Sequence, residues 1–446
     1  MVTRRSVLAG AAGVAGAVAG TSLLTACSGG NDNGSSGGGD TGGPVSGELE
    51  IQYFIGGYGD AWWNQVFADF ETANPEVKIV KHGGSTIHQE MKSRWISNDP
   101  PDLVEIEGAG ISESQMVADG QLLDLTEWLP TVKLDDGSAL QDRFIAPANT
   151  YENAVYSVPL IYDNRGTWFD QSWFTQQGWD VPTDLDSWQS SMSRIKQEAG
   201  IAPMATTGVY PTVFLTGVLY PAFAGVGGAQ LLNALIDGDE GAWTDPAVHE
   251  IATTVQEWVK AGFIDPGFAS LTHTQAQMNF LRHQNAYVPT GFWLPNEMKA
   301  DVPADFEFGV IPTPFNEPGA KMTVVPEVKT IAVAEKAKNP DAAKAFIKFI
   351  MSEKYAADFA RLSGGMLNIK GIDFATSKDV PAYLQSANAL LSDAEKVQLE
   401  YMAHPMHADL STPVGNALVS LLLGSTDAAG FVEAADKAAA AYRANR

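Results

Sequence analysis

The spacing between apolar residues changes several times along the first part of the chain. Apolar residues occupy alternate positions over residues 49–55, which predicts a half-buried strand. They recur at helical spacing over residues 60–73 and again over 87–97. Short apolar runs at 77–80 and 103–106 indicate two more strands. Strands that alternate with helices predict a parallel sheet covered on both faces, with a ligand at the carboxyl ends of its strands.

The rest of the chain has a different pattern. In residues 164–303 the apolar residues recur mainly at the spacing of a helix, and aromatic side chains are frequent. Strand-like segments return at 306–311 and 323–334, and an amphipathic helix follows at 340–350. The segment 381–446 is rich in Ala and Leu and indicates further helices. A folded part of about 400 residues predicts two domains.

The beginning of the chain has the pattern of an export signal. Arg4 and Arg5 precede an uncharged run over residues 7–24, and small residues follow before Cys27. This order is typical of a signal peptide, and its end resembles the bacterial lipobox. We therefore expect removal of residues 1–26 and lipidation of Cys27. The paired arginines also fit a twin-arginine signal, although Sec signals can carry such pairs, and a transmembrane helix is the alternative reading of the apolar run.

Residues 28–47 consist mostly of Gly, Ser, Asn and Asp. Such a composition buries too little apolar surface to fold and predicts a flexible tether. Together with stable lipid anchoring at Cys27, the tether predicts a protein held on the outer face of the cell membrane.

The charge and the cysteine content exclude several kinds of site. The chain has 53 acidic and 28 basic residues and a net charge of −25, which argues against nucleic acid as a partner. Cys27 is the only cysteine, so we expect no disulfide, no thiolate metal site and no cysteine nucleophile. His404 and His407 could share a helix face, but Pro405 lies between them and no third ligand is evident, so we expect neither metal nor cofactor.

Six segments, in this order, resemble the family 1 extracellular solute-binding proteins, the group that contains the maltodextrin binders. The segments are 74–79, 101–104, 120–125, 156–159, 309–314 and 338–346. Residues 289–298 and 107–110 look most like the binders of N-acetylglucosamine and chitobiose. The stretch 324–327 reads Val-Val-Pro-Glu where many members have a glycine-rich strand, which puts a ligand contact there in doubt.

The resemblance implies a two-lobed α/β fold of the type II periplasmic-binding-protein kind, in which each lobe is a doubly wound sheet and a hinge joins the two. The first lobe would comprise residues 48–160 with 309–360, and the second 164–308 with 361–446. A mono- or oligosaccharide would be held between the lobes and delivered to the transmembrane subunits of an ABC importer. We expect a monomer without enzymatic activity.

A sugar needs aromatic rings for its apolar faces and directional polar groups for its hydroxyls. Candidate stacking residues near expected strand ends are Trp62, Tyr210, Trp243 and Trp293. Candidate polar partners are Ser85, Glu107, Asn164, Asn296 and Glu297. Each has an alternative role: core packing is as plausible as binding for Trp62, and helix capping is as plausible for Asn296 and Glu297.

Two other functions stay open. The first is a secreted glycan-active enzyme, which needs two carboxylates facing each other across a bond. Glu105 and Glu107 lie on one face of one predicted strand and cannot flank a bond, but the many acidic residues leave other pairs possible. The second is a binding protein for a solute other than a sugar, such as a peptide or a polyamine.

Overall fold

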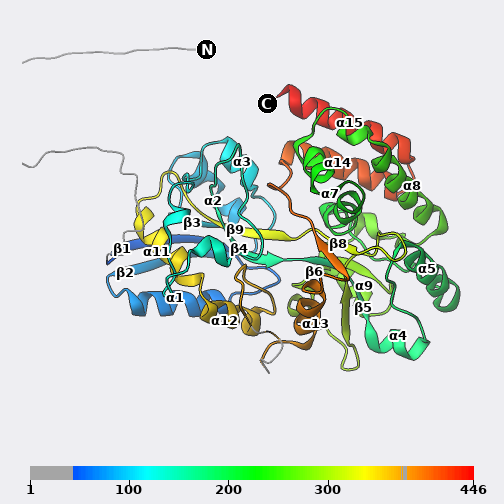
Figure 1. The fold of residues 1–446 in the computed structure, drawn as a ribbon, viewed down its shortest axis with the longest axis horizontal. Helices are drawn as coiled ribbons and strands as arrows, with labels where there is room; N and C mark the ends of the chain where they lie inside the picture. Colours follow the sequence, from blue (N-terminus) through cyan, green and yellow to red (C-terminus); the bar gives the residue numbers. More distant parts are fainter. Residues whose placement is uncertain (1–43, 373, 375–378, 446) are drawn as a thin grey trace, which may run out of the picture. The chain divides into compact units, whose positions relative to one another are not determined.

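The computed structural model describes residues 44–372, 374 and 379–445. The predicted export signal, Cys27 and most of the predicted tether lie outside the described residues, so these predictions are not tested by the structure. The remaining chain forms two lobes, each built on its own sheet (Figure 1).

The first lobe contains a five-stranded sheet with strand order β2-β1-β3-β9-β4. Its strands are β1 (Gly47–Phe54), β2 (Val77–Gly84), β3 (Leu103–Ile106), β4 (Val158–Asp163) and β9 (Glu327–Val333). β1 pairs in parallel with β2 and β3, which confirms the three strands predicted at the start of the chain. β9 is antiparallel to both of its neighbours and brings a distant segment into the sheet.

Helices cover both faces of this sheet, with α1 and α12 below it and α2 and α3 above it in Figure 1. The helices of this lobe are α1 (Ala61–Ala73), α2 (Ile87–Ile96), α3 (Glu113–Ala118), α11 (Pro340–Ile350) and α12 (Glu353–Ser363), with short 3-10 turns at Leu129–Thr131 and Leu140–Arg143. Alternate residues of β3 enter different cores: Leu103 packs with α1 and α11, and Val104 packs with α2. This alternation follows from the two-residue period of a strand.

The second lobe is built on a three-stranded antiparallel sheet, β6-β5-β7. Its strands are β5 (Arg165–Asp170), β6 (Val288–Gly291) and β7 (Phe308–Ile311), and a parallel pair is formed by β8 (Met322–Val324) and β10 (Val397–Leu399). Its helices are α4 (Gln171–Gln177), α5 (Leu185–Ala199), α6 (Thr212–Phe214), a π-helical turn (Leu215–Leu219), α7 (Tyr220–Asp237), α8 (Pro246–Ala261), α9 (His273–Leu281), α10 (Leu294–Glu297), α13 (Ala382–Leu391), α14 (Ala408–Leu422) and α15 (Ala428–Ala444), with 3-10 turns at Ala242–Thr244 and Phe268–Ser270. The two-lobed α/β class is as expected, but this sheet is not doubly wound.

The chain crosses between the two lobes at more than one place. The first crossing is at Asn164, between β4 and β5. β7, expected to begin the return to the first lobe at residue 309, pairs with β5 in the second lobe. The chain returns to the first lobe at Pro326. Because proline has no N–H group to donate in a sheet, the expected single strand 323–334 is divided there into β8 and β9. Asn368 still bonds to Leu160 of β4, so the last crossing also lies later than residue 361.

The long helical segment Thr212–Asp237 is the one described stretch that is apolar enough to span a membrane, and 61% of its most apolar window is buried. Its side chains, such as Phe223 and Leu235, pack in the core of the second lobe. This burial is typical of a core helix in a globular domain.

Asp102 connects three parts of the first lobe. Its Oδ2 accepts a hydrogen bond from the backbone N–H of Glu50 in β1 at 2.9 Å. Its Oδ1 accepts from the N–H groups of Lys338 at 2.6 Å and Asn339 at 2.8 Å. Asn339 in turn caps α11, as the sequence indicates, with Pro340 at the first helical position.

Replacing Asp102 with Ala should destabilise the protein by about 2–4 kcal/mol, because three backbone N–H groups lose their acceptor in a buried place. Urea unfolding followed by circular dichroism measures this loss. The exposed neighbour Asp99 is the control, because its ion pairs with Arg94 and Lys338 lie in solvent and Asp99→Ala should change little. Equal effects of the two substitutions would contradict this role of Asp102.

Candidate functional site

A cavity of about 310 Å³ lies between the two lobes. The first lobe contributes the end of β3 and the start of β9, and the second contributes Arg165, the π-helical turn and the start of α14. The wall consists of Ile106, Glu107, Gly108, Ile111, Ser112, Glu113, Arg165, Thr212, Leu215, Thr216, Tyr220, Glu327, Val328, Lys329, Thr330, Met402, Pro405, Met406, Ala408 and Ser411. The carboxyl end of β3, one of the parallel strands, therefore lines the cavity, as the fold rule for α/β sheets predicts.

Charged side chains beside the lobe crossings form a buried network, and its members Arg165, Glu327 and Lys329 line the cavity. Nε of Arg165 donates to Oε2 of Glu327 at 2.8 Å, and Nζ of Lys329 lies 3.3 Å from the same oxygen. Nζ of Lys329 also lies 3.5 Å from Oδ2 of Asp163, whose Oδ1 accepts from the Tyr58 hydroxyl at 2.8 Å. Burial alone would raise the pKa of Glu327, but Arg165 and Lys329 outweigh it and hold this pKa at about 2.

Arg165 has an unused donor in this network. Its side chain is 11% exposed, and its Nη1 is buried without a hydrogen-bond partner among the described residues. A buried donor without a partner is unfavourable and points to an acceptor that comes from outside the chain. Arg165 is therefore our candidate donor to an oxygen atom of a ligand.

Two glutamates of β3 and the loop after it are close enough to interact. Glu105 is buried, accepts from the N–H of Phe54 at 2.9 Å, and has a raised pKa because of burial and of Glu107. Burial raises the pKa of Glu107 to about 7, with further contributions from Asp163 and Glu327 and opposition from Lys329. Near neutral pH, Glu107 can thus present either a hydroxyl donor or a carboxylate acceptor to the cavity.

Trp293 lies where the lobes meet. Arg165 lies over its ring at 4.9 Å from the centroid, and Lys329 lies 5.7 Å away. Its Nε1 donates to Nε2 of His273 at 3.1 Å. Burial, with a contribution from Arg165, lowers the pKa of His273 to about 4, so the imidazole is neutral and can accept this bond. Trp293 thus supports Arg165, and Arg165 lines the cavity while Trp293 does not.

The lobes also touch through a glycine-rich loop after β1. A Cβ on Gly57 would lie 2.7 Å from the Cβ of Trp293, so only glycine fits there. Nδ2 of Asn296 donates to the carbonyl of Gly57 at 2.6 Å. Glu297 faces the second lobe instead and accepts from Nε2 of Gln277 at 2.9 Å. Asn296 is therefore a contact between the lobes rather than a helix cap.

Two of the predicted stacking residues are core residues. Trp62 is 1% exposed, and its Nε1 donates to the carbonyl of Tyr355 inside the first lobe. Trp243 is fully buried in the second lobe, and its ring packs against Phe223 and Phe431. Because protein atoms cover both rings, the prediction that they stack on a ligand is corrected.

The remaining candidates occupy different environments. Glu107 lines the cavity. Asn164 is fully buried at the first crossing, where its carbonyl accepts from the N–H of Phe292. Ser85 is exposed between β2 and α2, and Tyr210 is 43% exposed just before α6. Glu107 thus lines the same cavity as Arg165, and Trp293 contacts Arg165, whereas Ser85 and Tyr210 do not line this cavity.

Sequence reasoning missed Arg165, Glu327 and Lys329. A signal was present, because Glu327 and Lys329 are two residues apart and so point to one face of a strand, although the start of that strand was expected elsewhere. Sequence reasoning also missed Glu113, a buried carboxylate in the cavity wall that accepts from Asn149, Ser157 and Thr330.

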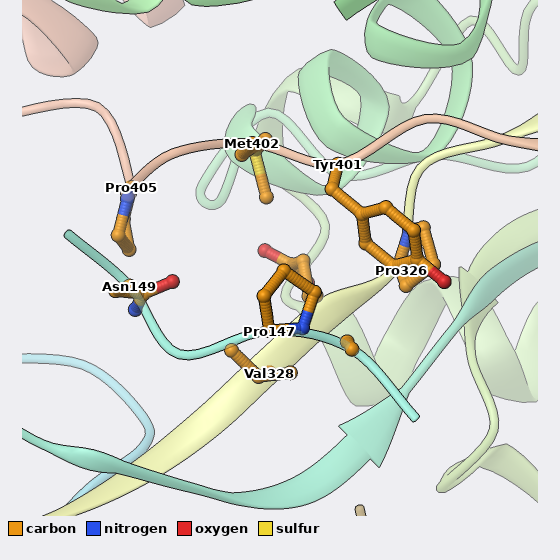
Figure 2. Close-up of a pocket in the computed structure, with 9 residues that line it drawn as sticks. Pro147, Asn149, Pro326, Val328, Tyr401, Met402 and Pro405 are labelled. Carbon is orange, nitrogen blue, oxygen red and sulfur yellow. The ribbon is translucent and has the colours of Figure 1, made fainter. Parts of the chain in front are cut away.

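A smaller cavity lies beside the cleft, and Figure 2 shows residues 401–405 passing over Pro147, Asn149 and Val328 there. Its volume is about 30 Å³, which is the space of a single water molecule. It is therefore too small for a sugar. Among the described residues, no group of three or more His, Cys, Asp or Glu side chains is arranged to hold a metal ion.

Comparison with known proteins agrees with this geometry. Residues 56–357 match the model of the bacterial extracellular solute-binding protein family. The chain belongs to this family. It is 24% identical over 418 residues to the diacetylchitobiose binding protein NgcE of Streptomyces coelicolor, with 89% of this chain and 85% of that protein covered.

Solved structures confirm the fold of this family member. A chitin oligosaccharide binding protein has a TM-score of 0.70 at 19% identity, covering 89% of this chain and 98% of that one. The GacH receptor of Streptomyces glaucescens has a TM-score of 0.69 at 20% identity, covering 90% and 98%. The two-lobed fold and the family expected from the sequence are thus confirmed.

The raised pKa of Glu107 predicts a pH-dependent stability. Because its pKa in the folded protein is about 7, above the ordinary value of 4.5, the folded state binds the proton more tightly than the unfolded state. The stability that protonation gives is present below about pH 4.5 and is lost as the pH rises through 7. Glu107→Gln should therefore gain roughly 2 kcal/mol over the wild type between pH 5 and pH 8.

Urea unfolding at several pH values measures this difference. Glu48→Gln is the control, because the Glu48 side chain is 68% exposed and its replacement should leave the pH profile unchanged. Parallel profiles for the wild type and Glu107→Gln would contradict the raised pKa.

Proposed function

We propose that this chain is the substrate-binding component of an ABC importer and that its solute is a neutral oligosaccharide of the chitin type. The observation that carries the proposal is the cavity wall itself, which Arg165, with its unpartnered Nη1, and the half-buried Glu107 both line. Two cations, Arg165 and Lys329, are compensated by Glu327 and Asp163. A wall with balanced charges and several directional groups suits a polar ligand without net charge.

The relatives support the choice of sugar. NgcE and DasA of Streptomyces coelicolor are both named diacetylchitobiose binding proteins, and DasA is 22% identical to this chain over 428 residues. A neutral acetamido sugar offers carbonyl and hydroxyl oxygens for the Arg165 donor and hydroxyl hydrogens for carboxylates. The cavity volume of about 310 Å³ is at the lower end of the usual range for ligand pockets, which suits a short oligosaccharide.

Delivery of the sugar to the permease requires the protein to stay close to the membrane. We propose that Cys27 carries a lipid that holds the protein on the outer face of the membrane, where residues 28–47 let the lobes reach the permease. The signal peptide and the small residues before Cys27 support this placement. We further propose that the protein acts as a monomer and releases its ligand without chemical change, since the relatives are binding proteins.

A thermal-shift screen tests the class of solute. Diacetylchitobiose and chitin oligosaccharides should raise the unfolding temperature, because a ligand selective for the native state stabilises it. Maltodextrins, cello-oligosaccharides, a polyamine and a peptide mixture form the comparison set. Chromatography of the recovered sugar should show it unchanged. A shift with the amine or the peptides alone would contradict the proposal, and cleaved sugar would indicate an enzyme.

Trp293→Ala should weaken binding of the best sugar at least about tenfold in calorimetry, because Arg165 loses the ring that supports it. Trp173→Ala is the matched control, since Trp173 is also a half-buried indole of the second lobe but stacks on His283 and does not line the cleft cavity. An unchanged affinity in Trp293→Ala, or equal losses in both variants, would remove Trp293 from the site.

A further inference from the structure

A second and larger cavity, of about 610 Å³, lies outside the cleft. The first lobe contributes α3 and the segment around Tyr151, and the second contributes the segment before α14 and the end of α15. In Figure 1 the C-terminal end of α15 lies beside α3. The wall consists of Ser114, Gln115, Val117, Ala118, Tyr151, Glu152, Ala154, Tyr156, His404, His407, Asp409, Tyr442 and Asn445.

No described residue lines both this cavity and the cleft cavity. The segments 112–115 and 404–409 nevertheless contribute residues to both cavities. Ser112 and Glu113 face the cleft while Ser114 and Gln115 face the larger cavity, and residues 404–409 divide in the same way. The two cavities are therefore lined by separate sets of side chains.

Three tyrosines and two histidines line the larger cavity. Tyr151, Tyr156 and Tyr442 are all half-buried residues of its wall. The imidazole of His404 stacks on Tyr151 with ring centroids 5.0 Å apart, and that of His407 stacks on Tyr442 at 5.3 Å. The imidazoles hold these rings in fixed positions, which lowers the entropy lost when a ligand packs against them.

A strained turn positions two of the tyrosines. Tyr151 and Ala154 exchange backbone hydrogen bonds of 2.9 Å around a two-residue turn. Glu152 and Asn153 at its centre have φ values of 52° and 71°, a left-handed conformation that favours glycine and asparagine. Glutamate is unfavourable there, and such strain is found most often at sites that bind ligands. Here Glu152 is exposed and lines the larger cavity.

We propose that this cavity is a second carbohydrate-binding site. Half-buried tyrosines supply surfaces for the apolar faces of sugar rings, and Gln115, Glu152 and Asp409 supply partners for hydroxyl groups. None of the described residues in its wall is a lysine or an arginine, so an anionic ligand does not suit it. The choice of a sugar as ligand rests on the proposed function, whereas the separation of the two cavities does not.

Calorimetry of the mature protein with tetra-N-acetylchitotetraose tests the second site. The wild type should give two binding events. Trp293→Ala should weaken only the tighter one, and Tyr442→Ala should weaken only the other, about tenfold, because it removes a stacking surface. Indole fluorescence should follow the tighter event, since Trp293 stacks on Arg165 of the cleft wall, whereas none of the described residues that line the larger cavity is a tryptophan. Tyr156→Ala is the second variant, and Leu423→Ala, an exposed side chain of the same lobe, is the control.

The possible outcomes separate the two proposals. A single event that Trp293→Ala weakens and both tyrosine variants leave unchanged overturns the second site and leaves the proposed function standing. A single event that only the tyrosine variants weaken supports the larger cavity and contradicts binding in the cleft. No event with the tetrasaccharide overturns the second site, and the sugar screen then decides the cleft separately.

Discussion

Arg165, Glu327, Lys329 and Asp163 are buried together beside the first two crossings between the lobes, from β4 to β5 and from β8 to β9, and the cleft depends on the balance of their charges. An ionised side chain that is buried without a partner is destabilising by several kcal/mol, so each member of the network requires the others. Because these residues belong to segments that are distant in the sequence, their pairing fixes the position of both crossings. The same pairing leaves the cavity wall polar without a large net charge.

The contact between the lobes at Gly57 and Trp293 is the second constraint on the cleft. The ring of Trp293 fits against a glycine that no other residue can replace without a clash, and Asn296 adds a hydrogen bond to the same glycine. Trp293 also supports Arg165, whose free Nη1 is directed by this stacking and by Glu327. A single indole therefore connects the closure of the lobes with the donor that we assign to the ligand.

Much of the fold could be predicted from the sequence, because it depends on local periods. The alternation at 49–55 and the capped helix α11 after Asn339 were visible without the structure. The second sheet was not, since antiparallel pairing of β5 with β6 and β7 joins segments more than a hundred residues apart. The site could also be predicted only in part. Glu107 could be found because it follows a predicted strand. The burial of Trp62 and Trp243 and the pairing of Arg165 with Glu327 depend on tertiary packing, which the sequence pattern does not show.

The central claim is that a sugar binds between the lobes against Arg165 and Glu107, and a crystal structure with bound diacetylchitobiose tests it most directly. The account predicts density for the sugar in the cavity of about 310 Å³, with an oxygen atom within hydrogen-bond distance of Nη1 of Arg165 and a hydroxyl near Glu107. Density for the sugar elsewhere, with the Arg165 donor still without a partner, would contradict it.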